Sequence, residues 1–135
     1  MTNQLIKVAV ADDNREFTNI LKETISRETD INLVGIAHNG EEMLAILEEK
    51  LPDVIVLDLI MPRLDGIGVL EKINASTFKR PKIIMLTAFG QESITQKTVE
   101  LGADYYILKP FNIEVLISRI RQLAGFCATA RQTAS

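Results

Sequence analysis

The sequence predicts an α/β domain in which helices cover both faces of a parallel sheet. Short, partly β-branched apolar runs alternate with longer segments of helical periodicity. Continuous apolar runs of this length are typical of strands buried on both faces, and their alternation with helices indicates a doubly wound sheet with right-handed crossovers. Four runs end in polar residues: 8–11 before Asp12 and Asp13, 54–57 before Asp58, 83–86 before Thr87, and 106–108 before Lys109.

The segments between these runs predict five helices and one further strand. Phe17, Ile20, Leu21 and Ile25 lie at i, i+3, i+4 and i+8, which predicts an amphipathic helix directly after the acidic pair, with Asn14 as its N-cap. The other expected elements are a strand over Ile31–Ala37, a helix capped by Asn39 with Glu42 and ended by Pro52, and helices over Gly66–Ala75, 91–101 and 112–124.

Length and composition favour one domain and exclude two classes of partner. The chain has 135 residues, of which 47% are hydrophobic, so we expect a domain over 1–124 and a frayed end or linker over 125–135. A net charge of −3 offers no broad positive field for nucleic acid or an anionic membrane, and no run reaches the ~18 apolar residues of a span. The lone cysteine, Cys127, excludes an internal disulfide and favours a cytoplasmic location.

The polar residues that end the four runs predict one site. Ligands of doubly wound sheets bind beyond the carboxyl ends of the strands, so these side chains are expected to converge there. Asp12, Asp13 and Asp58 would repel one another unless a divalent cation kept them ionised, and an all-oxygen donor set suits Mg²⁺ or Mn²⁺. The alternative is that Asp12 or Asp13 only caps the first helix.

Asp58 is the candidate nucleophile of this site. A carboxylate can accept a phosphoryl group to give an acyl phosphate, and such transfer depends mainly on positioning and charge neutralisation. Lys109 supplies a positive charge and Thr87 a hydroxyl donor for the phosphoryl oxygens. Taken singly, Thr87 is consistent with a turn residue and Lys109 with a solvated surface charge. Their joint position at the ends of separate strands favours the site.

Several stretches resemble the receiver domain of two-component response regulators. They are VADD at 10–13, LDLIMP at 57–62 with DG at 65–66, LTA at 86–88, and KPF at 109–111. The resemblance extends roughly over residues 5 to 124 and implies a flavodoxin-like fold with strand order 2-1-3-4-5. It also implies a phosphohistidine donor, such as a histidine kinase or phosphotransferase, and a Lys109–Pro110 bond in the cis form.

The same resemblance implies a role for each matched residue. Phosphorylation would draw Thr87 inward and alter the surface built from the fourth helix, fifth strand and fifth helix, which also suggests dimerisation through that face. The implied roles are Asp58 as phosphoacceptor, Asp12, Asp13, Asp58 and the Ile60 carbonyl as metal ligands, Thr87 and Lys109 as phosphoryl contacts, and Tyr106 as the switch aromatic.

A narrower resemblance concerns the receivers of sporulation regulators in endospore-forming bacteria. The stretches ADDNRE at 11–16, LTAFGQE at 86–92 and ILKPF at 107–111 are similar to those receivers. This resemblance implies sporulation control of transcription. In such regulators a DNA-binding effector domain follows the receiver, so the chain is expected to be either an excised receiver or a stand-alone regulator.

Two other classes of protein are weighed against a signalling switch. A Mg²⁺-dependent phosphohydrolase with an Asp nucleophile commonly has a second acid two residues after the nucleophile, and here that residue is Ile60. A flavin-binding carrier needs a phosphate loop rich in Ser, Thr and Gly after the first strand, where this chain has an acidic pair.

The residues beside the site also predict a long-lived acyl phosphate. Ile60 lies two residues after Asp58, and Phe89 lies two residues after Thr87. Both can cover a phosphoryl group with hydrocarbon, and neither can orient an attacking water. We therefore expect slow self-dephosphorylation and removal of the phosphate by a dedicated phosphatase.

Overall fold

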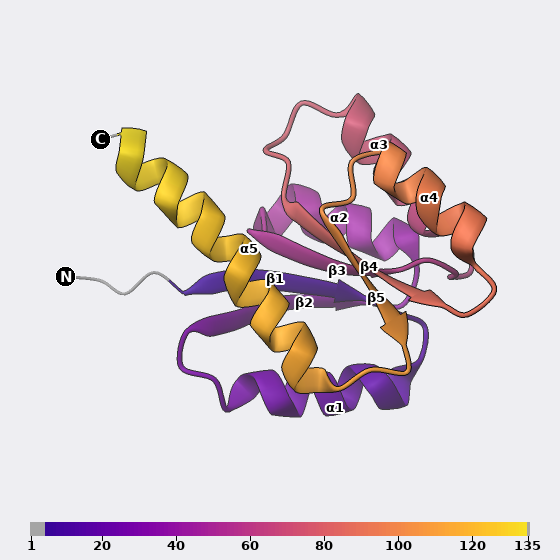
Figure 1. Ribbon diagram of the computed structural model, residues 1–135, viewed down its shortest axis with the longest axis horizontal. Helices are drawn as coiled ribbons and strands as arrows, with labels where there is room; N and C mark the ends of the chain where they lie inside the picture. Colours follow the sequence, from indigo (N-terminus) through magenta and orange to yellow (C-terminus); the bar gives the residue numbers. More distant parts are fainter. Residues whose placement is uncertain (1–4, 135) are drawn as a thin grey trace.

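The computed structural model describes the backbone of residues 5–134 and side chains as far as residue 125. Five parallel strands form one sheet in the order β2-β1-β3-β4-β5, and helices alternate with them along the chain (Figure 1), which confirms the fold class. The elements are β1 Ile6–Ala11, α1 Arg15–Ser26, β2 Ile31–Ala37, α2 Gly40–Lys50, β3 Val54–Asp58, α3 Gly66–Ala75, β4 Lys82–Ala88, α4 Glu92–Glu100, β5 Tyr105–Lys109 and α5 Ile113–Ala134.

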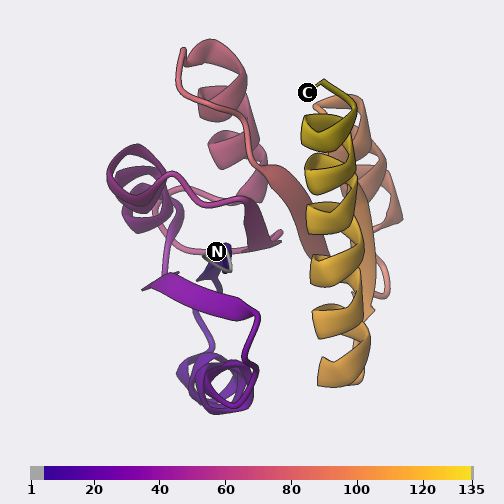
Figure 2. The ribbon, with the colours of Figure 1, turned by 90° about the vertical axis from the view of Figure 1, so that its left-hand side faces the viewer.

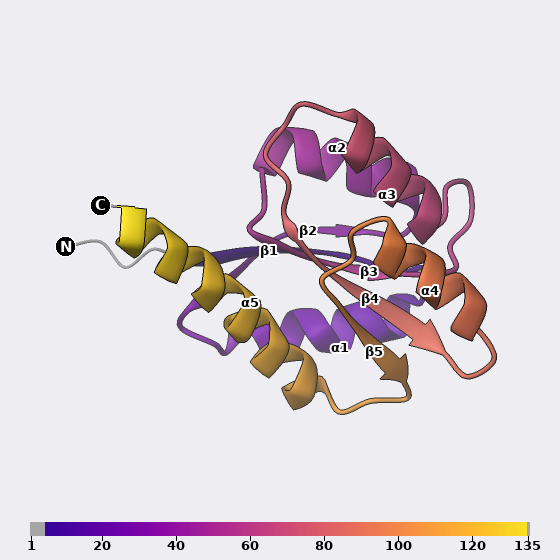
Figure 3. The ribbon, with the colours of Figure 1, turned by 45° about the horizontal axis from the view of Figure 1, so that its top comes forward.

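The helices cover both faces of the sheet, as doubly wound topology requires. In Figure 3, α2, α3 and α4 lie on one side of the strands and α1 and α5 on the other. Each face has its own apolar core, one built around Leu21, Ile25 and Leu116 and the other around Met43, Leu47 and Val69. Strand β3 is buried along its whole length, as the sequence predicts. The two cores therefore fix the strand whose last residue is Asp58.

The fifth strand corrects one expectation, because it is not buried on both faces. Tyr106 and Leu108 are 52% and 50% exposed, whereas Ile107 between them is buried. Strand β5 is an edge strand that pairs only with β4, and side chains along a strand alternate between its faces. The face that carries Tyr106 and Leu108 borders an open groove beside α4, whereas the Ile107 face packs into the α1–α5 core.

Side chains at three helix starts set where the helices begin. Asn14 accepts a hydrogen bond from the Phe17 N–H at 3.1 Å, and Asn39 accepts one from the Glu42 N–H at 2.9 Å. Both caps confirm the sequence prediction. Asp65 caps α3 in the same way, whereas α4 has no side-chain cap hydrogen bond.

The fifth helix is longer than the sequence predicts. Residues 125–134, expected as a frayed end or linker, continue α5 without a break, while Ser135 lies outside the described residues. Ala, Arg and Gln are good helix formers, and Gly125 costs only about 1 kcal/mol relative to Ala, so the helix does not end there. Figure 2 shows α5 from the side and α1 nearly along its axis, so the two helices on this face cross at a wide angle.

Along the described part of the chain, no helix combines the length and the apolar composition that crossing a bilayer would need.

Candidate functional site

Three carboxylates meet at the carboxyl ends of β1 and β3, as the sequence predicts. Asp12, Asp13 and Asp58 each offer an oxygen, and these oxygens all lie within 4.8 Å of one another. Asp12 is fully buried and Asp58 is 8% exposed, whereas Asp13 faces solvent. Lys109 comes from the end of β5, and its Nζ lies 3.1 Å from Asp12 Oδ2 and 3.4 Å from Asp58 Oδ2.

Asp12 does not cap α1 with its side chain through the usual i to i+3 bond, since Asn14 makes that bond. The Asp12 carboxylate instead accepts hydrogen bonds from the Asn14 backbone N–H, at 2.9 Å, and from the Lys109 ammonium. Its own N–H donates to the Ala37 carbonyl at 3.0 Å, which ties it to the end of β2. A buried carboxylate needs such partners, because an unpaired buried charge is costly.

Aromatic side chains, as well as the neighbouring carboxylates, hold Lys109 over the site. Its Nζ lies 6.0 Å from the centre of the Phe17 ring, and Phe17 packs edge-to-face against Phe111 with ring centres 5.8 Å apart. Burial acts to lower the pKa of the ammonium, but the carboxylates of Asp58 and Asp12 outweigh it and raise that pKa. Lys109 therefore stays charged. The Lys109–Pro110 bond is cis, which confirms the expectation.

The Asp58 carboxyl group carries an unfavourable charge. Burial, together with the charges of Asp12 and Asp13, raises the pKa of Asp58 from 3.8 to about 6, although Lys109 acts in the opposite direction. A single ammonium against three carboxylates leaves a formal charge of 1 − 3 = −2. One divalent cation would neutralise this charge.

The donor set fits Mg²⁺ or Mn²⁺. All three side-chain donors are carboxylate oxygens, which hard divalent cations prefer. Three donors do not complete the coordination shell of such a cation, which leaves positions for water or phosphate oxygens. The residues that would hold the cation are Asp12, Asp13 and Asp58, and the cation would neutralise charge on a transferring group. The Ile60 carbonyl, in the loop after β3, stays a predicted fourth ligand.

Gly66 allows the loop after Asp58 to fold back tightly. Its N–H donates to the Leu59 carbonyl at 3.0 Å, and a Cβ at this position would lie 2.9 Å from the Asp58 carbonyl oxygen. Any larger residue would push against the main chain of Asp58. The glycine in the DG stretch at 65–66 therefore allows the loop to pack closely against the main chain of Asp58.

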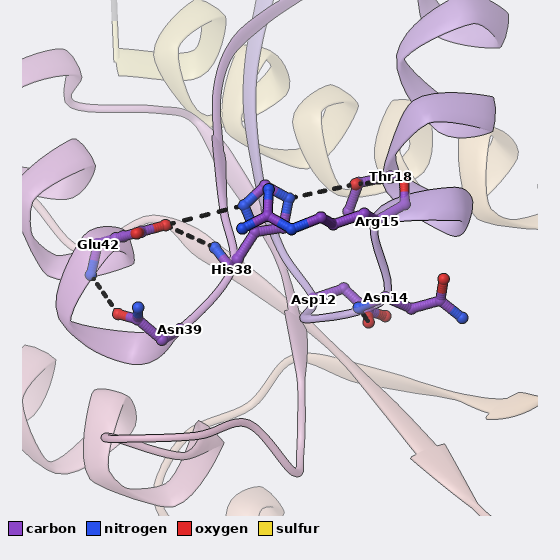
Figure 4. A network of polar contacts seen from close by, with 7 residues as sticks. All are labelled: Asp12, Asn14, Arg15, Thr18, His38, Asn39 and Glu42. Carbon is purple, nitrogen blue, oxygen red and sulfur yellow. Dashed lines mark hydrogen bonds and ion pairs between the residues drawn. The ribbon is translucent and has the colours of Figure 1, made fainter.

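A polar network connects Asp12 to the first turns of α1 and α2 (Figure 4). His38 donates its backbone N–H to Glu42 Oε1 at 2.8 Å, and its Nε2 lies 3.5 Å from the hydroxyl of Thr18. The Thr18 hydroxyl also donates to the Arg15 carbonyl at 3.1 Å. The network holds the first turn of α1, and Asn14 at the start of that turn orients the Asp12 carboxylate. No sequence pattern indicates the contact between His38 and Thr18, because it joins the end of β2 to α1.

Thr87 and Tyr106 border one groove, as their predicted role in a switch requires. Thr87 is buried near the end of β4, and Tyr106 is half exposed on β5. A groove of about 370 Å³ lies between these strands and α4. Its lining residues are Thr87, Ala88, Glu92, Thr95, Gln96, Val99, Tyr106 and Leu108.

Ile60 and Phe89 lie in the loops that follow β3 and β4. Their side chains are 50% and 87% exposed. Shielding of a phosphoryl group by these side chains stays a prediction for the phosphorylated protein.

Two contacts near the site were not predicted from the sequence. Phe17 was assigned only to the apolar stripe of α1, yet its ring lies beneath Lys109. Gln91 was expected as the first residue of the fourth helix, but its side-chain oxygen accepts a hydrogen bond from the Ala88 N–H at 2.8 Å. The Phe17 contact depends on how α1 packs against the end of β5, and the Gln91 contact depends on how the loop between β4 and α4 folds.

A doubly wound sheet whose strand ends carry three carboxylates, a lysine and a threonine defines a phosphoryl-accepting domain of the flavodoxin-like fold. The family model of the response regulator receiver domain matches residues 8–121. The chain belongs to this family, whose members act as signalling switches in two-component systems.

Solved structures agree with this assignment. The REC domain of AraT, a response regulator from Geobacillus stearothermophilus, is 26% identical with a TM-score of 0.83, over 95% of this chain and 99% of that one. The response regulator domain of Thermotoga maritima CheB is 31% identical with a TM-score of 0.79, over 89% and 96%. The receiver domain of the Francisella response regulator 1452 is 32% identical with a TM-score of 0.76, over 87% and 94%.

The raised pKa of Asp58 predicts that this residue destabilises the fold at neutral pH. Because the folded-state pKa, about 6, lies above the ordinary 3.8, the favourable contribution is present below pH 3.8 and is lost as pH rises through 6. Asp58→Asn should therefore raise the free energy of unfolding at pH 7.5 in EDTA by about 1–3 kcal/mol. Urea unfolding measures this difference.

The pH dependence separates this effect from a general gain in packing. The advantage of Asp58→Asn over wild type should shrink steadily between pH 6.5 and pH 4. The control is Glu100→Gln, which removes an exposed carboxylate at the end of α4. An equal increase in the free energy of unfolding in both variants, or an increase at pH 7.5 that persists at pH 4, would show that the charge of Asp58 does not destabilise the fold.

Proposed function

We propose that this domain accepts a phosphoryl group from a phosphohistidine donor onto Asp58, using Mg²⁺ or Mn²⁺. One observation carries the proposal: the Lys109 ammonium contacts both Asp12 and Asp58, at 3.1 and 3.4 Å, across the ends of three strands. A nucleophile, a fixed positive charge and a set of metal ligands therefore meet at one point. Phosphoryl transfer requires mainly such positioning and charge neutralisation.

The transfer step follows from the chemistry of the two reactants. An Asp58 carboxylate oxygen attacks phosphorus, and the bond from phosphorus to the donor imidazole nitrogen breaks. The imidazole nitrogen leaves with the electron pair, and the product is an acyl phosphate on Asp58. Lys109 holds one phosphoryl oxygen by its charge, and the Thr87 hydroxyl donates to another.

The output is a change of surface. Movement of Thr87 toward the phosphoryl group would free space in the groove that Tyr106 borders, and Tyr106 would move into it. The face of α4, β5 and α5 would then present a different shape to a partner or to a second copy of the domain. A coupling of about 1–3 kcal/mol would change the affinity for that partner roughly 5–150-fold.

The other classes of protein have less support. A phosphohydrolase would need an acid where Ile60 stands, and nothing in the comparisons points to that class. A role in sporulation and transcription control rests on the quoted stretches alone, since none of the three named structures is described as a sporulation regulator. We further propose that donor and domain meet in the cytoplasm, and that a phosphatase ends the signal.

The assignment of Asp58 predicts a complete loss of phosphate uptake in Asp58→Asn. The amide cannot form an acyl phosphate, so incubation with acetyl phosphate and Mg²⁺ should add 80 Da to the wild type, the mass of one phosphoryl group, and nothing to the variant. Intact-protein mass spectrometry measures the addition. Asp13→Asn is the matched control, because it removes a ligand but not the nucleophile and should slow uptake without abolishing it. Phosphate uptake by Asp58→Asn at the wild-type rate would refute the assignment.

The side chains of Ile60 and Phe89 predict a slow loss of the phosphate. Hydrolysis needs a water aligned opposite the Asp58 oxygen, and neither apolar side chain can hold one. The wild-type half-life should be minutes or longer, and Ile60→Asn or Phe89→Glu should shorten it at least several-fold. The double variant should lose phosphate fastest.

The lifetime is measured by following labelled phosphate in Mg²⁺ after the donor is removed. Leu51→Asn serves as a control, because it places the same polar group at the end of α2, before the amino end of β3, whereas Asp58 lies at the carboxyl end of that strand. A wild-type half-life of seconds, or equal half-lives in all variants, would contradict the role of these two residues.

A further inference from the structure

The loop between β4 and α4 is closed by two hydrogen bonds between the same two residues. The Gln91 N–H donates to the Ala88 carbonyl at 3.1 Å, and the Ala88 N–H donates to Gln91 Oε1 at 2.8 Å. Gln91 immediately precedes α4, yet its side chain does not cap that helix. The side chain turns back to the strand and binds the residue directly after Thr87.

The direction of the Ala88 N–H follows from the sheet. The Leu86 carbonyl accepts from the Leu59 N–H at 3.0 Å, so Leu86 presents its backbone groups to the β3 side of β4. Backbone groups along a strand alternate in direction with a period of two, so Ala88 also faces the β3 side. Strand β3 ends at Asp58, which pairs with Leu86. The Ala88 N–H therefore points over the end of β3, beyond the last ladder bond.

A partly buried N–H at this point needs an acceptor, since an unmade hydrogen bond is costly. In this structure the acceptor is the neutral amide oxygen of Gln91. A phosphoryl group on Asp58 would bring charged oxygens to the same end of β3, and a charged acceptor forms the stronger bond. The Gln91 oxygen and the phosphoryl oxygen thus compete for one donor.

We propose that Gln91 is a latch on the phosphoryl site: its side-chain oxygen occupies the Ala88 N–H in the unphosphorylated protein and must leave before that N–H binds the phosphoryl group. The latch rests on the proposed function and adds a residue that opposes activation. The hydrogen bond between Gln91 and Ala88 must break before the phosphoryl group binds. The free energy of breaking it lowers the apparent affinity of the site for a phosphoryl group.

Opening the latch requires movement of a side chain only. The Gln91 carbonyl accepts hydrogen bonds from the Thr95 N–H at 2.8 Å and from the Thr95 hydroxyl at 2.7 Å, so α4 holds the main chain of Gln91 in place. Gly90, with φ of +92°, makes the turn between them, and no atom lies within 4 Å of where its Cβ would be. Gln91 itself is only partly buried, so its released side chain can turn toward solvent.

The sign of the effect distinguishes a latch from a structural bond. If the Gln91 contact only stabilises the loop, its removal should weaken phosphoryl binding or leave it unchanged. If the contact is a latch, its removal should strengthen phosphoryl binding, because Ala88 is already free. A stronger acceptor at the same position should do the opposite.

The test is a titration with beryllofluoride, which mimics a phosphoryl group on a carboxylate, in Mg²⁺. The Ala88 amide resonance reports the contact directly, and overall binding is read from other site amides by NMR. Gln91→Leu keeps the size of the side chain but lacks the acceptor, and it should bind beryllofluoride on the order of three- to tenfold more tightly than wild type. Gln91→Glu holds the N–H with a charged oxygen and should bind threefold or more weakly.

Controls separate the latch from the proposed function. Gln122→Leu makes the same chemical change on an exposed residue of α5 that does not line the groove, and it should bind within about twofold of wild type, while urea unfolding shows whether each variant is folded. Equal or weaker binding by Gln91→Leu, with normal binding by wild type, would overturn the latch alone. Tighter binding by Gln91→Glu would overturn it too. Failure of the wild type to bind beryllofluoride at all would overturn the proposed function, and the latch with it.

Discussion

The Lys109 ammonium lies between the buried carboxylates of Asp12 and Asp58, and the rest of the site depends on this arrangement. Two acids at the ends of neighbouring strands would repel each other strongly in a buried position. One ammonium reduces that repulsion but does not remove it, since the pKa of Asp58 is still raised to about 6. The fold thus holds an excess of negative charge that a divalent cation would neutralise.

Most of the fold follows from local patterns that the sequence displays. The buried runs, the Asn14 and Asn39 caps and the Gly66–Ala75 helix are each encoded within about ten residues, and all were predicted. Two features differ from what these local patterns predict. The exposure of Tyr106 depends on β5 lying at the sheet edge, and the continuation of α5 depends on helix propensity outweighing a glycine and a missing apolar stripe.

Some features of the candidate site could also be predicted from the sequence, and others could not. The positions of Asp12, Asp58 and Lys109 follow from the rule that parallel strands end at one edge, so their convergence was predictable. The bond from the Ala88 N–H to Gln91 was not, because it arises where β3 stops and β4 continues by two residues. The register between strands decides which backbone N–H groups of the sheet have no hydrogen-bond partner on a neighbouring strand. No sequence pattern encodes that register.

The three converging carboxylates form an incomplete site without a divalent cation. Isothermal titration of Mg²⁺ into wild type and Asp13→Ala tests this directly, because Asp13 is the exposed ligand whose removal disturbs the buried pair least. We expect the wild type to bind one Mg²⁺ saturably. We expect the affinity of Asp13→Ala for Mg²⁺ to be at least tenfold weaker, since a lost charged ligand costs more than about 1.4 kcal/mol. No saturable binding by the wild type, or equal affinity in the two proteins, would contradict it.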